Sequence, residues 1–474
     1  MKVDFNKLNR AFNPKVLVVV GDSKASGYQW IRGQMGLQGK LYSVHVNPES
    51  REEIKAMGIQ SFPSILDVPE PVDLAIVAVS RNAAPTVLED LIKKDVAAAH
   101  FFSAGFSETK TEEGRRLEKL LVEKAEKANF HLIGPNCMGL FNPAVGIKQA
   151  DTQYDGVSGP VGFISQSGSI SISFCFDAHL QGIDINKSIS YGNGIVLDSA
   201  DFLDYFAQDS EIKATAMYIE GVKNGERFFA SLKAAAAKKP VIIWKGGRTE
   251  EGSRAIASHT GSLASSQTIW ETAVRQCGAM NARNMEELVD TTKALLFLSD
   301  VKGNRMVIAG GPGGQSVIST DIFAEVGLNV PVFTNESYAE LETFFNTVGG
   351  SYQNPIDSAG PTRQDMKRVL DIVVRDANID NIFYMVSSRP GSGFMAGHVS
   401  NTLDMLDAIR KSSPKPLITA VFLQTPDAQR EVREVMFKLQ NLGIPAFPSV
   451  QRAATALKNA LDYYEGVRRR RVQQ

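Results

Sequence analysis

The stretch Val16-Leu-Val-Val-Val-Gly-Asp-Ser-Lys-Ala-Ser-Gly27 decides the fold class. Its first five residues are apolar and mostly β-branched, which predicts a buried strand. Gly21 and Gly27 bound a turn after this strand, and a helix is predicted to follow the turn. A strand, a turn and a helix in this order form the unit from which parallel α/β sheets are built.

The same alternation of short apolar runs and longer periodic stretches continues to the end of the chain. Strands are predicted at residues 16–20, 41–46, 74–79, 98–102, 131–133, 161–164, 187–190, 214–219, 241–244, 305–309, 382–386 and 417–422. Helices are expected between them, for example over residues 83–94, 112–129, 170–180, 285–298 and 452–464. Segments rich in glycine, proline or charge, at residues 142–160 and 300–304, separate three blocks. The sequence therefore predicts three α/β domains, over residues 1–145, 146–300 and 301–474.

The composition is typical of a folded protein with large apolar cores. At about 150 residues per domain, 474 residues agree with three domains. Hydrophobic residues make up 43% and charged residues 22%, which excludes a disordered chain. Lys+Arg 51 and Asp+Glu 52 leave a net charge of -1, so no general basic field favours nucleic acid as a partner. The block Arg468–Arg471 is interpreted as a solvated tail.

Membrane and secreted classes are also disfavoured. The longest apolar stretches have the length of strands, whereas a membrane-spanning helix needs about 20 residues. The first residues, Met-Lys-Val-Asp-Phe-Asn-Lys, lack the apolar core of a signal peptide. Three cysteines are too few for a disulfide framework and show no metal-ligand spacing. We therefore expect a cytoplasmic protein with no membrane partner and no metal site of its own.

The turn between Gly21 and Gly27 is a candidate phosphate-binding loop. Glycines let the backbone approach a phosphate, and a helix N-terminus supplies free N–H groups. The pattern G-x-G-x-x-G is absent, and the second strand ends in Asn47-Pro48 without an acid for a ribose, so NAD is disfavoured. The spacing fits two interpretations equally well: a site for another nucleotide-containing ligand, or an ordinary strand-to-helix turn. The sequence also lacks the ATP-binding pattern Gly-x4-Gly-Lys-Ser/Thr.

His259 lies in the polar, glycine-containing segment 245–264, with hydroxyl side chains on both sides of it. This segment follows a strand and precedes a helical pattern, so we predict a long loop at the C-terminal end of a sheet, where ligands bind. A neutral imidazole can accept a phosphoryl group and pass it on. Acyl transfer by a serine is disfavoured because no G-x-S-x-G elbow occurs. The other five histidines are interpreted as structural.

Two further elements of the same block suit a phosphorylated histidine. The run Ser165-Gln-Ser-Gly-Ser169 follows a strand and opens a helix, so its hydroxyls and N–H groups could hold a phosphate. Glu220 ends a strand, and its carboxylate could accept the hydrogen of one imidazole nitrogen and leave the other free to attack. Each element alone could equally be a helix cap or a surface acid. Together with His259, they lie at strand ends of one predicted domain.

Seven motifs, in this order along the chain, resemble those of a known family. They are Phe12-Asn-Pro14, Gly134-Pro-Asn-Cys-Met-Gly139, Ser165-Gln-Ser-Gly168, Tyr218-Ile-Glu-Gly221, Ser258-His-Thr-Gly-Ser-Leu-Ala264, Gly311-Pro-Gly-Gly314 and Asn354-Pro-Ile-Asp357. The chain resembles the α subunit of the NDP-forming acyl-CoA synthetases, which include the ADP-forming acetate–CoA ligases and are relatives of succinyl-CoA synthetase. The motif that contains His259 is the most specific of the seven.

The resemblance implies an α/β fold with an N-terminal Rossmann-like CoA-binding domain followed by two flavodoxin-like (succinyl-CoA synthetase-like) domains. It implies that His259 is phosphorylated and that Glu220 is its stabilising acid. The phosphate is expected at Ser165, Ser167, Gly168 and Ser169. Coenzyme A is expected at Gly21, Ser23 and Lys24, with Asn136 and Cys137 near its thiol. Asp22 departs from the family pattern, because an acid beside a phosphate is unfavourable unless it points away.

The resemblance also implies a reaction and a partner. In such enzymes an acyl-CoA and phosphate give an acyl phosphate, whose phosphoryl group moves to the histidine and then to ADP. Nucleotide and Mg²⁺ are expected on a separate ATP-grasp β subunit, so a hetero-oligomer is expected. Two alternatives remain: a non-catalytic regulatory protein that binds CoA or acyl-CoA, and an enzyme whose histidine passes the phosphoryl group to another acceptor.

Overall fold

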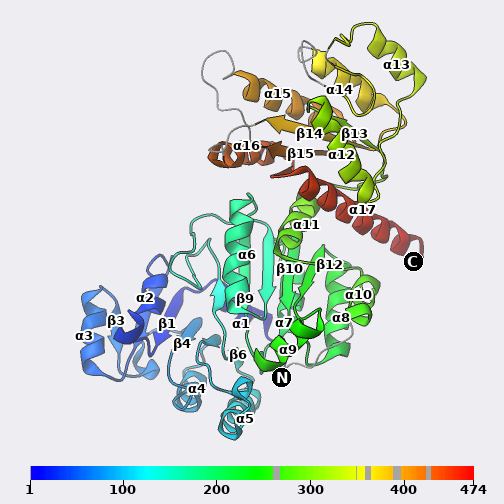
Figure 1. The fold of residues 1–474 in the computed structure, drawn as a ribbon. Helices are drawn as coiled ribbons and strands as arrows, with labels where there is room; N and C mark the ends of the chain where they lie inside the picture. The colour runs from blue at the N-terminus through cyan, green and yellow to red at the C-terminus, as the bar shows by residue number, and fades with distance from the viewer. Residues whose placement is uncertain are drawn as a thin grey trace. The chain divides into compact units, whose positions relative to one another are not determined.

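The computed structural model of the chain describes residues 2–259, 267–348, 350–357, 365–387, 397–422 and 429–473, which form three sheets with helices beside them (Figure 1). Residues 1–179 and 183–283 make one compact unit, which contains the first two sheets. Residues 180–182 and 284–474 make a second unit, which contains the third sheet. The limits of the three predicted domains stay predictions.

The first sheet is parallel throughout and has the strand order β3-β2-β1-β4-β5-β6. This is the Rossmann order. Alternate residues of β1 enter different apolar cores, with Leu17 and Val19 in one and Val18 in the other. A strand buried on both faces explains the continuous apolar run. The strands are β1 Val16–Val20, β2 Lys40–Val44, β3 Gln60–Phe62, β4 Leu74–Val77, β5 Ala98–Phe101 and β6 His131–Ile133.

The helices of this part begin at recognisable caps. Asn47 accepts the N–H of Glu49 at 2.7 Å, and Pro48 is the first helical residue, so Asn47-Pro48 starts a helix. Thr111 likewise accepts the N–H of Gly114 at 3.1 Å. The helices are α1 Phe5–Phe12, α2 Gln29–Gly33, α3 Pro48–Ala56, α4 Ala84–Lys93 and α5 Glu112–Lys127, with 3₁₀ turns η1 Lys24–Ser26, η2 Ile65–Asp67 and η3 Ser107–Thr109.

The second sheet has the order β12-β11-β10-β8-β9-β7, and only β7 runs antiparallel to its neighbour. Without β7 the order is that of flavodoxin-like folds. The strands are β7 Gly139–Phe141, β8 Val161–Ser165, β9 Ile185–Ser190, β10 Ala214–Ile219, β11 Val241–Lys245 and β12 Met280–Ala282. The helices are α6 Gly168–Leu180, α7 Ser199–Gln208, α8 Gly225–Ala236, α9 Glu250–His259 and α10 Gln267–Gln276.

The predicted long loop over residues 245–264 is wrong in its middle, where α9 forms. Thr249 accepts the N–H of Gly252 at 3.0 Å, which caps the start of this helix. Glu250 and Glu251 occupy its first turn, where carboxylates stabilise the helix dipole. The segment therefore carries a helix-start signal that its glycines and hydroxyls conceal. Residues 260–264 lie outside the described residues.

The third sheet is parallel, with the order β13-β14-β15-β16. On the edge opposite β14, the N–H of Met306 donates to the carbonyl of Asn329 at 2.7 Å, and Arg305 forms a parallel bridge with Asn329. At the position of the second strand of a flavodoxin-like sheet, this unit thus has a single bridge at Asn329. The strands are β13 Met306–Ala309, β14 Asn381–Ser387, β15 Leu417–Phe422 and β16 Ala446–Phe447.

Seven helices belong to this unit among the described residues: α11 Met285–Phe297, α12 Gly313–Glu325, α13 Asn335–Glu342, α14 Met366–Arg375, α15 Gly397–Ser412, α16 Gln429–Asn441 and α17 Val450–Gln473. The basic block interpreted as a solvated tail continues α17, and Arg468 pairs with Asp300 at 3.0 Å. None of the described helices is long and apolar enough to cross a membrane.

Candidate functional site

Several predicted site residues lie at the points where strand order reverses in the first two sheets, whereas Asn136 and Cys137 follow the edge strand β6. In the first sheet this point lies between β1 and β4, and Gly21 follows β1. In the second sheet it lies between β8 and β10, and Ser165 and Glu220 lie where these two strands end. Ligands of open α/β sheets bind at such switch points. The structure therefore brings the predicted phosphate-binding run and the predicted acid to the ends of two neighbouring strands at one switch point.

The run from Ser165 to Ser169 forms a turn at the start of α6. The buried hydroxyl of Ser165 donates to the carbonyl of Ser167 at 2.6 Å and accepts the N–H of Ser167 at 3.2 Å. The hydroxyls of Ser167 and Ser169 lie 3.2 Å apart, beside the first residue of the helix, Gly168. The first N–H groups of a helix have no intrahelical partner and attract anions. Ser165 thus shapes the turn, while the hydroxyls of Ser167 and Ser169 can still form hydrogen bonds to a ligand.

Glu220 is a buried acid, 7% exposed, with one uncommitted oxygen. Its Oε1 accepts the hydroxyl of Tyr218 at 3.4 Å, whereas its Oε2 has no hydrogen-bond donor among the described residues. A buried carboxylate oxygen without a donor is costly, so a further donor is expected there. Burial, and then Glu220, raise the pKa of Tyr218, which keeps that hydroxyl protonated.

Gln166 joins the serine turn to the end of β10. Its side-chain Oε1 accepts the backbone N–H of Glu220 at 2.8 Å and that of Gly221 at 3.0 Å. Its own N–H donates to the carbonyl of Tyr218 at 3.0 Å. The turn after β8 and the end of β10 are therefore held together by one side chain, which the sequence interpretation did not single out.

Lys245 is a second positioning group that the sequence interpretation missed. Its buried ammonium donates to the carbonyls of Glu220 and Gly246, both at 2.7 Å. Burial lowers the pKa of Lys245, and the charge of Glu220 opposes that shift. A lysine at the end of an apolar strand is the signal that could have identified it. The ammonium ties the end of β10 to the residue after β11.

His259 is the last residue of α9, and its side chain lies outside the described residues. The helix follows β11, which pairs in parallel with β10; Ile219 is paired with Lys245. The chain thus leaves the sheet one strand away from Glu220 before it reaches His259. The geometry between His259 and Glu220 stays a prediction.

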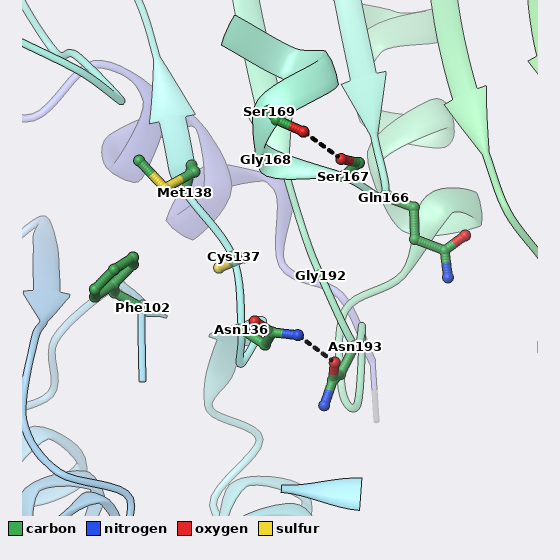
Figure 2. A pocket seen from close by; sticks show the side chains of 10 residues that line it. All are labelled: Phe102, Asn136, Cys137, Met138, Gln166, Ser167, Gly168, Ser169, Gly192 and Asn193. Atoms are coloured by element: carbon green, nitrogen blue, oxygen red, sulfur yellow. Dashed lines mark hydrogen bonds between the residues drawn. The ribbon is translucent and has the colours of Figure 1, made fainter. Parts of the chain in front are cut away.

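A pocket of about 210 Å³ opens beside the start of α6 (Figure 2). It unites Asn136 and Cys137, predicted near the thiol of coenzyme A, with three of the four predicted phosphate-binding residues; Ser165 is not among its lining residues. Figure 2 shows the hydroxyls of Ser167 and Ser169 on one side and the hydrogen-bonded amides of Asn136 and Asn193 on another. Its lining residues are Phe102, Asn136, Cys137, Met138, Gln166, Ser167, Gly168, Ser169, Gly192 and Asn193.

Cys137 lines this pocket as a neutral thiol. Its Sγ lies 3.5 Å from the carbonyl of Phe101, to which it donates, and the side chain is buried. Burial raises the pKa of Cys137 to about 12. Because the thiolate is the nucleophilic form, Cys137 offers apolar surface at neutral pH and no nucleophile.

The glycine loop after β1 does not line this pocket, but the structure explains its unusual acid. The buried carboxylate of Asp22 accepts the N–H groups of Trp30 at 2.9 Å and Ile31 at 3.0 Å. Asp22 therefore points away from the surface and satisfies two N–H groups in the first turn of α2. Lys24 is exposed and pairs with Glu53 at 2.6 Å.

A CoA binding domain family matches residues 15–143, and a succinyl-CoA ligase like flavodoxin domain family matches residues 158–295. The chain is 37% identical over 456 residues to acetate–CoA ligase [ADP-forming] II subunit alpha of Pyrococcus furiosus, covering 95% of this chain and 96% of the relative. The chain belongs to the ADP-forming acetate–CoA ligase family. The predicted fold class and family resemblance are confirmed.

Other members of the ADP-forming acetate–CoA ligase family are longer. Acetate–CoA ligase [ADP-forming] I of Archaeoglobus fulgidus is 34% identical over 392 residues, and the chain spans only 56% of its length. Among solved structures, the dinucleotide forming acetyl-coenzyme A synthetase 1 of Ca. Korarchaeum cryptofilum in complex with phosphate and ADP has a TM-score of 0.83. It shares 30% sequence identity, and the match covers 98% of this chain and 97% of that one.

Proposed function

We propose that the chain is the α subunit of an ADP/NDP-forming acyl-CoA synthetase, an acid–thiol ligase. The enzyme would interconvert acyl-CoA, NDP and phosphate with a carboxylic acid, CoA and NTP. The observation that carries this proposal is the uncommitted, buried Oε2 of Glu220 beside the Ser167–Ser169 turn. An imidazole N–H is the donor that this oxygen lacks, and an acid paired with a histidine beside an anion site suits a phosphorylated histidine.

The first step takes place in the pocket of Figure 2. Coenzyme A is proposed to lie along Gly21, Ser23 and Lys24, with its thioester near Asn136 and Cys137. A phosphate oxygen attacks the thioester carbonyl, the carbon–sulfur bond breaks, and CoA leaves as a thiolate that takes up a proton. Ser167 and Ser169 hold the phosphate through their hydroxyls, and the start of α6 stabilises its charge.

The second step transfers the phosphoryl group to His259. One imidazole nitrogen attacks phosphorus, and the bond between phosphorus and the acyl oxygen breaks, which releases the carboxylate. Glu220 accepts the hydrogen of the other imidazole nitrogen. This hydrogen bond selects the nucleophilic tautomer and stabilises the positive charge that develops on the ring.

The third step needs a partner. An oxygen of the terminal phosphate of ADP attacks phosphorus, and the phosphorus–nitrogen bond breaks to give ATP. We place the nucleotide and Mg²⁺ on a separate ATP-grasp β subunit, in a cytoplasmic hetero-oligomer. Relatives named as α subunits, which the chain matches over 96% of their length, support this division. Gly246 and Gly247 at the base of α9 could absorb the rotation that carries His259 to the partner.

The test is phosphorylation by ATP. The chain is combined with a candidate ATP-grasp subunit and γ-labelled ATP, and acid-labile, base-stable label is measured. We expect label on the chain that is lost in His259→Ala and kept in the control His179→Ala. Absence of label, or equal label in His259→Ala, would contradict the proposal. Discharge of the label without CoA and a carboxylic acid would favour a different phosphoryl acceptor.

A further inference from the structure

One side of the pocket beside α6 is apolar. Phe102 and Met138 lie on the same side of it in Figure 2, and the amides of Asn136 and Asn193 lie on another side. The ten described residues that line the pocket are neutral side chains or glycines, including the protonated thiol of Cys137. The pocket thus offers polar groups at the phosphate and thiol positions and an apolar wall between them.

Met138 stands directly beside the predicted phosphate position. A Cβ atom on Gly168 would lie 2.4 Å from Cγ of Met138, so only glycine lets the side chain of Met138 approach the first residue of α6 this closely. The backbone N–H of Met138 donates to the hydroxyl of Ser190 at 3.1 Å, which holds the residue in place. An acyl group bonded to a phosphate at this helix start would therefore lie next to the side chain of Met138.

Phe102 forms the rest of the wall and is anchored from behind. Its ring meets the indole of Trp30 edge-on, with centroids 5.0 Å apart. Trp30 is 3% exposed, and its own backbone N–H is held by the carboxylate of Asp22 at 2.9 Å. Phe102 is 37% exposed, and its ring is backed by a buried side chain that resists displacement.

The amides opposite this wall are also fixed. Asn193 donates from Nδ2 to Glu108 at 2.7 Å and to Glu118 at 3.2 Å, and its Oδ1 accepts from Asn136 at 3.4 Å. Neither wall can recede without breaking these contacts. We infer that Met138 and Phe102 determine the acyl chain length that the enzyme accepts, and that they favour a short, uncharged chain. This inference rests on the proposed function.

The test measures acyl selectivity without the partner subunit. The chain is given an acyl-CoA and arsenate; an arsenate oxygen attacks the thioester carbonyl and CoA leaves. The acyl arsenate then hydrolyses to acid and arsenate, so each turnover releases one countable thiol. We compare acetyl-, propionyl-, butyryl-, hexanoyl- and succinyl-CoA. Beyond the length that the wall admits, each added methylene should lower kcat/KM by about 10-fold or more.

Substitutions of the wall should move this limit in both directions. Met138→Ala and Phe102→Ala should raise the ratio of hexanoyl- to acetyl-CoA turnover by about 10-fold or more. Met138→Trp should lower the ratio of butyryl- to acetyl-CoA turnover. Met35→Ala, at a side chain 56% exposed on the surface, is the matched control and should leave every ratio unchanged.

Two results would overturn the inference: unchanged ratios in both alanine variants, or succinyl-CoA turned over as well as propionyl-CoA by the unsubstituted chain. If that chain releases thiol from no acyl-CoA, the proposed function is contradicted instead. In that case, titration calorimetry with the same five thioesters tests whether Met138 and Phe102 select the acyl length, through the ratios of the Kd values. Circular dichroism confirms that each variant is folded.

Discussion

At the scale of single residues, the chemistry depends on Glu220. Its side chain is buried, its Oε1 accepts the Tyr218 hydroxyl at 3.4 Å, and its Oε2 is uncommitted among the described residues. The backbone on which it sits is tied to Gln166 and Lys245. These contacts hold a carboxylate at the strand end where the proposed phosphohistidine needs an acceptor.

Replacing Glu220 by glutamine should slow phosphorylation of the chain by about 10²- to 10⁴-fold, the range that general acid–base groups contribute. The amide keeps the shape of the side chain but removes the charge that stabilises the imidazolium. The rate of label transfer from ATP, measured by rapid quench, checks this. Glu226→Gln, at an exposed position in the first turn of α8, is the matched control. Equal rates in the two variants would remove Glu220 from the mechanism.

At the scale of elements, a buried histidine lies between the first two sheets. His100, on β5, is fully buried, and a Cβ on Gly139 of β7 would lie 1.9 Å from its Nδ1. Its ring centroid is 5.3 Å from that of Trp30, and neither ring nitrogen has a hydrogen-bond partner among the described residues. Burial lowers the pKa of His100 to about 3, so the ring is neutral in the folded protein.

Acid should therefore destabilise the folded chain through His100. Between pH 6.5 and about 3 the unfolded chain binds a proton at His100 that the folded chain does not, so stability is lost as the pH falls. One such proton contributes about 1.4 kcal/mol per pH unit. Urea unfolding at pH 6.5, 5.5 and 4.5 should show a shallower loss in His100→Leu than in the control His45→Leu. If the free energy of unfolding falls with pH at the same rate in both variants, His100 is not the buried neutral group that causes the loss.

The strands were largely predictable because most are short apolar runs buried on both faces. Residues 16–20, 131–133, 214–219 and 417–422 are strands with the predicted limits. The predicted loop before His259 failed because the helix-start signal of Thr249, Glu250 and Glu251 was outweighed by nearby glycines. The edge strand β7 was not predicted, because it has only three residues and its antiparallel partner β9 is far away in the sequence.

The candidate site was predictable only in part. Ser167, Ser169 and Glu220 were predictable because they follow strands that meet at one edge of a sheet. Phe102, Met138 and Asn193 were not singled out, because their neighbourhood is created by packing between segments far apart in the chain. Gln166 acts through backbone groups, which leaves no pattern in a single sequence, whereas the position of Lys245 at the end of an apolar strand is a signal that could have identified it.

At the scale of the whole molecule, the described site lies within one compact unit. The two matched domain families, the pocket and Glu220 all belong to the part that contains the first two sheets, except for residues 180–182 and 284–295 of the flavodoxin-like match. This unit contains the groups proposed for the steps that involve CoA, phosphate and the acyl group. Those steps should therefore proceed without nucleotide and without a partner subunit.

The most direct test of the proposed mechanism uses the chain alone. It is incubated with acetyl-CoA and ³²P-labelled phosphate, and the phosphorylated residue is located by mass spectrometry under alkaline conditions. The proposed mechanism predicts labelled phosphate on His259, release of acetate and free CoA, and no label in His259→Ala. Release of CoA without any phosphohistidine, or label on another residue, would contradict it.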